Sequence, residues 1–168
     1  SGFVRAAREW SANQIIRLTG DCPLVPVDLI QWLIIEFNMF PRPCAFAPDY
    51  LGTTRPSLAY PDGFDIEIFT REALEITNRE ARGEDREHVT SFLWRQPDRF
   101  RLKSLTPLAD PWVLQLKLSV DNAEDLKRVD QIAQHLPQYG ADPHDEFSMA
   151  ATLKAAREVL DETSDHDV

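Results

Sequence analysis

Apolar and polar positions alternate along the chain with two different periods, which predicts helices and strands in turn. Between Pro26 and Phe37 the apolar residues recur every three or four positions, as on one face of a helix. Between Phe64 and Phe69 they recur at every second position, as on one face of a strand. Alternating helices and strands are typical of an α/β fold.

The whole chain can be divided in this way. Helices are expected at Phe3 to Trp10, Pro26 to Phe37, Thr70 (as the cap) to Ala81, Asp85 to Trp94, after Asp121, and Asp145 to Leu160. Strands are expected at Asn13 to Leu18, Cys44 to Ala47, Phe64 to Phe69, Phe100 to Leu105 and Val113 to Val120. Residues 48–56 read as a loop, and the acidic residues 161–168 as a frayed tail.

Composition narrows the class of protein. The 168 residues are 43% hydrophobic and 27% charged, which suits one domain, or most of one, with a buried core. A net charge of −10 argues against nucleic acid and against an anionic membrane surface as partners. Cys22 and Cys44 form no CxxC pair and nothing resembles a signal peptide, so we expect no zinc site and a cytoplasmic location.

The segment RLTGDCPL, residues 17–24, carries the first candidate for chemistry. After the expected strand, Gly20 permits a turn that a side chain would obstruct, and Pro23 and Pro26 stop the strand from continuing. Asp21 is thereby delivered to the carboxyl edge of the sheet, where open α/β sheets bind ligands and where a carboxylate can hold magnesium. For an isolated motif of this kind, a turn aspartate that bonds to its own backbone is the commoner outcome.

A second aspartate follows another expected strand. Leu118 and Val120 belong to one face of that strand, and Asp121 comes at its end, before Asn122 opens the next helix as a cap. Taken alone, Asp121 is most simply a residue that helps the helix to begin.

The central part of the chain presents further charged residues. Tyr60 to Gly63 reads as a turn, followed by acids that alternate with apolar residues along a strand. Such alternating acids are commonly just the solvated face of a strand. Arg86, Glu87 and His88 begin an expected helix, where local pairing with neighbouring acids is the simplest role.

Four blocks in the same order resemble one family. They are RLTGDCPLVPVDLI, which carries a GDCPLI-like signature, YPDGFDIEIF (60–69), REHVTSFLWRQPDRFRL (86–102) and LSVDNAEDL (118–126). Together they resemble the cytidylyltransferases typified by spore coat polysaccharide biosynthesis protein F, which are related to CMP-sugar-acid synthetases. The resemblance covers the chain from its first expected helix to about Leu136.

The resemblance implies a three-layer α/β fold of the nucleotide-diphospho-sugar transferase type, which is GT-A or Rossmann-like. The implied activity is transfer of CMP from CTP to a sugar or sugar-acid acceptor, with release of pyrophosphate, in polysaccharide or glycoconjugate biosynthesis. It also implies that Asp21 and Asp121 are the catalytic residues and hold Mg²⁺ together. Thr19 and Gly20 are expected to be cofactor-binding residues beside them.

On the acceptor side, the resemblance adds pocket residues and contacts to a sugar or phosphate oxygen. The expected substrate-binding residues are Asp62, Asp65, Glu67, Arg86, Glu87 and His88. The sequence itself does not identify the acceptor, the base or the oligomer.

Members of this family begin with a strand and a loop of the type G-S-x-R-x-x-G-K, whose N–H groups and cations hold the triphosphate. This sequence contains no such loop. We therefore expect residues 1–136 to be the C-terminal part of such a domain, truncated at its N-terminal edge, and residues 137–168 to add a helix and a tail. Alone, the chain should be inactive and should form a homo-oligomer or associate with the missing segment. A non-catalytic remnant that acts as a binding module, and a transferase for another nucleotide, stay open as alternatives.

Overall fold

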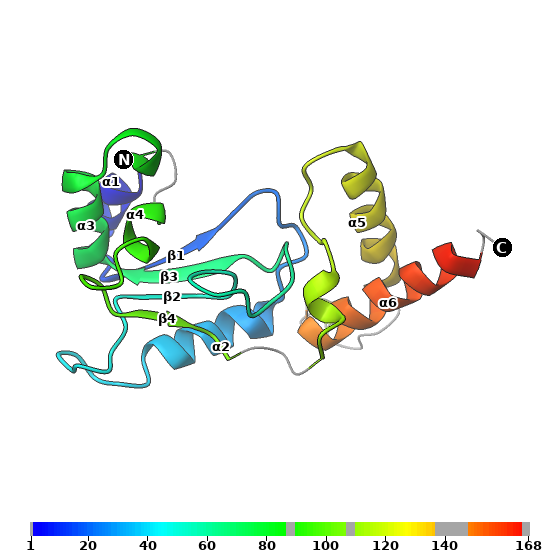
Figure 1. The fold of residues 1–168 in the computed structure, drawn as a ribbon, viewed down its shortest axis with the longest axis horizontal. Coiled ribbons are helices and arrows are strands. Elements are labelled where there is room, and N and C mark those ends of the chain that lie inside the picture. The colour runs from blue at the N-terminus through cyan, green and yellow to red at the C-terminus, as the bar shows by residue number, and fades with distance from the viewer. Residues whose placement is uncertain (1, 87–89, 107–109, 137–147, 166–168) are drawn as a thin grey trace. The chain divides into compact units, whose positions relative to one another are not determined.

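A computed structural model describes residues 2–86, 90–106, 110–136 and 148–165 and shows a mixed α/β chain (Figure 1). The α-helices are α1 (Gly2–Glu9), α2 (Val27–Phe37), α3 (Arg71–Glu80), α4 (Ser91–Trp94), α5 (Ala123–His135) and α6 (Met149–Asp165). The strands are β1 (Gln14–Leu18), β2 (Tyr50–Gly52), β3 (Ile66–Thr70) and β4 (Leu102–Ser104). Two 3-10 helices, η1 (Gly83–Arg86) and η2 (Val113–Gln115), complete the described elements. The predicted α/β class is therefore confirmed.

The chain divides into two compact units. The sheet unit comprises Ser1–Leu18, Leu33–Ala59 and Ile66–Thr106, and the second unit, called here the α5–α6 unit, comprises Thr19–Trp32, Tyr60–Asp65 and Pro107–Val168. The sheet unit has 13 Lys and Arg against 11 Asp and Glu, a net charge of +2. The α5–α6 unit has 5 against 17, a net charge of −12, so the acidity of the chain belongs entirely to this unit.

The sheet has the strand order β1-β3-β2-β4 and is mixed. β3 pairs antiparallel with both β1 and β2, whereas β2 and β4 run parallel. β3 is buried along its whole length. β1 is an edge strand, and its residues alternate between exposed and half-buried. The strand expected at Asn13 to Leu18 is thus present as β1.

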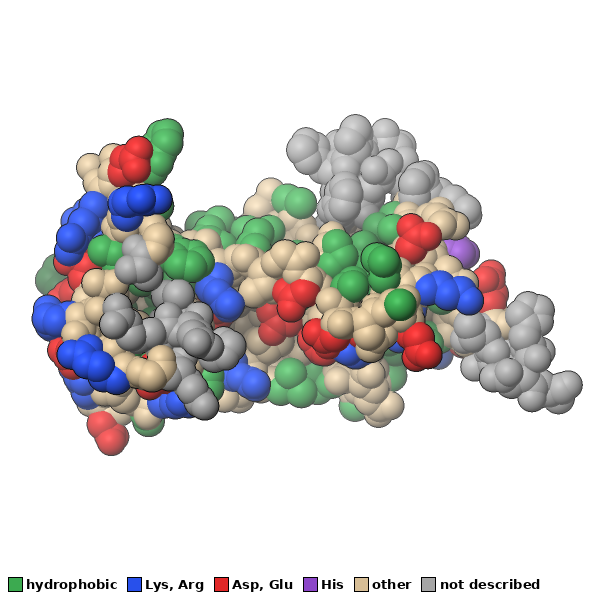
Figure 2. All heavy atoms as spheres, turned by 90° about the horizontal axis from the view of Figure 1, so that it is seen from above, with side chains coloured by type: hydrophobic (Ala, Val, Ile, Leu, Met, Phe, Trp, Pro, Cys, Tyr) green, Lys and Arg blue, Asp and Glu red, His purple; other side chains and the backbone are tan. Residues whose placement is uncertain are grey.

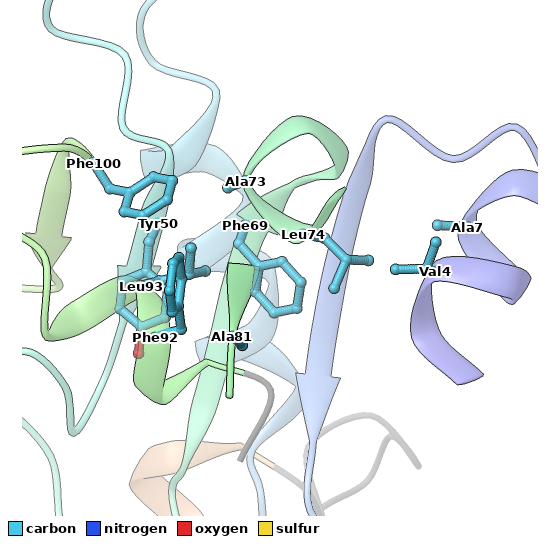
Figure 3. Packing of buried hydrophobic residues seen from close by; sticks show 10 residues of the cluster. All are labelled: Val4, Ala7, Tyr50, Phe69, Ala73, Leu74, Ala81, Phe92, Leu93 and Phe100. Carbon is cyan, nitrogen blue, oxygen red and sulfur yellow. The ribbon is translucent and has the colours of Figure 1, made fainter. Parts of the chain in front are cut away.

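One face of the sheet carries the main core of this unit. Its buried side chains come from α1, β2, β3, α3, α4 and the segment before β4, and they pack around the rings of Tyr50 and Phe69 (Figure 3). Phe92 and Phe100 meet edge to face, with ring centroids 6.2 Å apart. The opposite face is covered by the C-terminal half of α2, where Glu36 pairs with Lys103 of β4 at 2.8 Å.

Local capping follows the sequence closely. The Thr70 side chain accepts a hydrogen bond from Ala73 N at 3.1 Å and starts α3. Asn122 accepts hydrogen bonds from Glu124 N and Asp125 N and starts α5. Both predicted caps are confirmed, because each depends only on residues within one helical turn.

Several expected elements differ from the structure. Residues 44–47 form turns, and the strand of this region is β2, inside the expected loop. Residues 113–120 begin with η2 and form only an isolated bridge, between Lys117 and Asp62. Within the helix expected over 85–94, the described residues show the end of η1 at Arg86 and the short α4. Helix α6 continues to Asp165 through most of the expected tail.

Two general features complete the fold. Among the described residues, no helix combines the length and the apolar character that crossing a membrane requires. Cys22 is buried, Cys44 is half-buried, and both are free thiols.

Candidate functional site

The loop after β1 forms a short turn around Cys22. Cys22 N donates to the Thr19 carbonyl at 3.3 Å, and the Thr19 hydroxyl contacts Cys22 Sγ at 3.1 Å. A Cβ added at Gly20 would meet nothing within 4 Å, so space does not require glycine there, contrary to the expectation. The turn leaves Asp21 exposed.

The chain segments that carry Asp21 and Asp121 are joined by a backbone hydrogen bond. Val120 N donates to the Asp21 carbonyl oxygen at 2.8 Å, which places the residue before Asp121 directly on the Asp21 turn. Both residues belong to the α5–α6 unit. The structure thus joins the two chain segments, and the joint binding of Mg²⁺ by Asp21 and Asp121 stays a prediction.

Lys117 forms ion pairs with Asp121 and Asp125. Its Nζ lies 2.6 Å from Asp121 Oδ2 and 2.7 Å from Asp125 Oδ2, while Arg128 Nη2 lies 2.6 Å from Asp125 Oδ1. Hydrogen bonds from Lys117 and then Arg128 hold the pKa of Asp125 well below its usual range. Hydrogen bonds to Asp121 and then to Asp125 raise the pKa of Lys117, so this ammonium stays charged beside Asp121.

The segment that carries Asp62 and Asp65 contains a turn that packs against Leu118. Phe64 N donates to the Pro61 carbonyl, so the turn runs one residue later than expected, with Gly63 at a φ of +102°. A Cβ at Gly63 would lie 2.3 Å from Leu118 C, which explains the glycine. Leu118 N in turn donates to the Asp62 carbonyl at 2.7 Å. Asp62 is therefore fixed by its backbone beside the segment that carries Asp121.

Asp65 closes the same turn with its side chain. Its Oδ2 accepts a hydrogen bond from Gly63 N at 2.9 Å and lies 3.8 Å from Cys22 Sγ. Burial raises the pKa of Cys22 to about 11, and the carboxylates of Asp65 and Asp21 act in the same direction. Cys22 is therefore a neutral thiol at neutral pH, next to the two acidic loops.

Glu67 belongs to the sheet unit and is buried, so it does not lie on a solvated strand face. Its Oε1 accepts a hydrogen bond from the Tyr50 hydroxyl at 2.6 Å. Its Oε2 accepts from Arg17 Nη1 at 2.6 Å and from the Thr90 hydroxyl at 3.0 Å. Burial and the Glu67 carboxylate raise the pKa of Tyr50, so its hydroxyl remains a donor.

Sequence reasoning missed three members of this network, Arg17, Tyr50 and Thr90. The nearest signal was Arg17, a charged residue inside an otherwise apolar strand. No local sequence pattern indicates that Tyr50 and Thr90 contact the same carboxylate, because residues 17, 50, 67 and 90 are far apart in the sequence.

The remaining predicted residues lie around η1. Arg86 is the last residue of η1, its side chain is outside the described part, and Glu87 and His88 lie outside the described residues. The neighbouring Asp85 accepts a hydrogen bond from the Ser91 hydroxyl at 2.6 Å and pairs with Arg95 at 3.0 Å. The roles of Arg86, Glu87 and His88 stay predictions.

The predicted Mg²⁺ site would rest on two carboxylates, those of Asp21 and Asp121. Within residues 2–86, 90–106, 110–136 and 148–165, no group of three or more His, Cys, Asp and Glu side chains is arranged to hold a metal ion. A site built on Asp21 and Asp121 would therefore need ligands from a substrate or from water.

Comparisons with known proteins identify the fold. No protein-family model matches the chain. The chain is 30% identical over 146 residues to an uncharacterized protein of Methanocaldococcus jannaschii, and the match covers 83% of this chain and 54% of that protein. A solved cytidylyltransferase structure from Leptospira borgpetersenii is similar with a TM-score of 0.73 and 23% identity, covering 96% of this chain and 62% of the other. The chain thus has a nucleotidyltransferase-like fold and spans little more than half the length of these relatives.

Proposed function

We propose that the chain belongs to a cytidylyltransferase that transfers CMP from CTP to a sugar or sugar-acid acceptor and releases pyrophosphate. The observation that carries the proposal is the hydrogen bond from Val120 N to the Asp21 carbonyl, which joins the two acidic turns. The fold supports it, because the similar Leptospira structure is that of a cytidylyltransferase.

The two carboxylates suit a magnesium ion bound together with a nucleotide. Mg²⁺ prefers oxygen ligands, commonly takes one or two carboxylates, and completes its coordination with water and phosphate oxygens. Asp21 and Asp121 offer that donor set on adjoining segments. When bound, the ion would neutralise phosphate charge as pyrophosphate leaves.

The chain's own residues would do the remaining work by position and charge. In the reaction, an acceptor oxygen forms a bond to the α-phosphorus, the bond from that phosphorus to the β-phosphate breaks, and the acceptor proton passes to a base. Lys117 Nζ lies 2.6 Å from Asp121 Oδ2 and is the partner that a metal would replace. Thr19, which is half-buried, and Gly20, which is exposed, lie beside Asp21 and are the proposed cofactor-binding residues.

The acceptor side would use Asp62, Asp65 and Glu67, with Arg86, Glu87 and His88 as further contacts. The structure supports a positioning task for two of these acids. Asp65 fixes the Pro61–Phe64 turn, and Glu67 fixes Arg17, Tyr50 and Thr90.

The test is pyrophosphate release by the complete protein in the presence of Mg²⁺. CTP should be consumed in preference to ATP, GTP and UTP, and only when a sugar or sugar acid is added. In the same assay, His88→Ala should raise the acceptor KM while the affinity for CTP stays unchanged. Equal use of all four nucleotides would overturn the assignment of CTP as the substrate. Loss of CTP binding in the His88 variant would overturn the assignment of His88 to the acceptor side.

A further inference from the structure

We propose that the sheet unit carries a binding site for an oxyanion, either a phosphate or a carboxylate group, built from Arg17, Arg55 and Arg95. The inference deepens the proposed function, on which it rests in one respect: the anion is taken to be part of the acceptor. The site itself is defined by contacts within the sheet unit and does not depend on CTP chemistry.

Arg17 is held by a buried acid. Its Nη1 lies 2.6 Å from Glu67 Oε2, and that carboxylate is 7% exposed and also bound to Tyr50 and Thr90. A guanidinium offers five N–H donors in a rigid fork, so fixing one edge orients the others. The Arg17 side chain is 27% exposed, and therefore its remaining donors can reach a solvent-borne anion.

Two further guanidinium groups share one aromatic ring. Arg55 lies over Trp94 at 5.7 Å from the ring centroid, and Arg95 lies over the same ring at 5.2 Å. Stacking on an aromatic face positions a guanidinium and leaves its N–H edge available. Among the described residues, Arg55 forms no ion pair, and its side-chain hydrogen bonding is limited to a long, 3.4 Å bond from Nη1 to the Thr54 carbonyl.

Gly52 connects this pair to Arg17. A Cβ built at Gly52 would lie 2.5 Å from the Arg55 carbonyl oxygen and 2.7 Å from the Tyr50 hydroxyl oxygen. The Arg55 carbonyl oxygen and the Tyr50 hydroxyl therefore both lie beside Gly52, and that hydroxyl binds Glu67, which in turn binds Arg17. Consistently, the positive charges of Arg17 and Arg55 both act to lower the pKa of Tyr50 against the stronger effect of burial.

The local charge favours an anion. Arg17 is balanced by Glu67 and Arg95 by Asp85, whereas Arg55 is not balanced among the described residues. The sheet unit as a whole has a net charge of +2 in a chain of −10, and Figure 2 shows Lys and Arg side chains gathered over the part that holds α1, α3 and α4. Charge-assisted, bidentate bonds from arginine suit both carboxylates and phosphates.

The experiment titrates the purified chain, without CTP, with inorganic phosphate, with D-glucuronate and with neutral D-glucose. Binding is followed by NMR of the arginine Nε–H groups. Arg55→Gln removes a cation that pairs with none of the described acids, and Arg5→Gln in α1 is the matched control. Arg17→Lys keeps the charge and removes the fork.

We expect phosphate or glucuronate, and not glucose, to shift the Arg17, Arg55 and Arg95 resonances. Arg55→Gln and Arg17→Lys should each weaken binding roughly tenfold, and Arg5→Gln should leave it unchanged. The stronger of the two anions identifies the acceptor group. Equal effects of the Arg5 and Arg55 substitutions, or no shift of these resonances with either anion, would overturn the site. Anion binding without CMP transfer in the complete protein would instead refute the proposed function and leave the site intact.

Discussion

Glu67 shows how much a single residue depends on distant partners. The alternation of apolar and acidic residues predicted its strand correctly, but its burial is set by Arg17, Tyr50 and Thr90, which come from three other segments. A carboxylate with three donors is stable when buried, because each donor replaces a bond that water would have made.

Removing the charge of Glu67 should therefore destabilise the chain. Glu67→Gln leaves Arg17 without its counter-ion, and we expect the free energy of unfolding in urea to fall by about 2 kcal/mol or more. Glu75→Gln is the control, because the Arg8–Glu75 pair is exposed on both sides and should change stability by under about 1 kcal/mol. Similar losses for both variants would contradict the buried network.

Elements with local signals were predictable, and those that need a distant partner were not. Thr70 and Asn122 were recognised as caps because their bonds stay within one turn. The extended segment before Asp121 was expected to be a strand. It lies beside the Asp62 turn and the Asp21 loop, and each of these accepts one backbone hydrogen bond from it instead of forming the repeated bonds of a sheet. For the candidate site, the sequence supplied the residues, and only the fold could show that Lys117 pairs with Asp121.

Substitution of Gly63 tests the packing of its turn against Leu118. Gly63→Ala places a Cβ against the Leu118 and Ser119 backbone at a φ of +102°, and we expect a loss of about 2 kcal/mol or more in thermal or urea unfolding. Gly20→Ala, where nothing lies within 4 Å, should be nearly neutral. Unchanged stability of the Gly63→Ala variant would show that the turn does not pack on Leu118.

At the scale of the whole molecule, β1 is the edge strand of the sheet, with no second strand partner among the residues that the structure describes. Arg71 N donates to the Asn13 carbonyl, so by strand alternation the odd residues of β1 face β3, and Gln14, Ile16 and Leu18 direct their backbone groups outward. Ile16 and Leu18 are also exposed, at 38% and 49%. An open apolar edge favours addition of another strand.

We therefore expect the isolated chain to self-associate, as measured by light scattering after gel filtration. Ile16→Lys should shift the population towards the monomer, because two β1 strands that pair antiparallel about Ile16 would bring the lysines together. Ile35→Lys, at a more exposed position on α2, should leave association unchanged. A monomeric chain at all concentrations would contradict this expectation.

The central claim is that Asp21 and Asp121 act together on a nucleotide, and its most direct measurement is pyrophosphate release from CTP by Asp21→Asn in the complete protein. The substitution preserves size and the backbone bond to Val120 but removes a metal-binding charge. The account predicts that Mg²⁺-dependent release falls at least about a hundredfold with the fold unchanged, while Asp130→Asn on α5 keeps full activity. An Asp21→Asn protein as active as the wild type would contradict it.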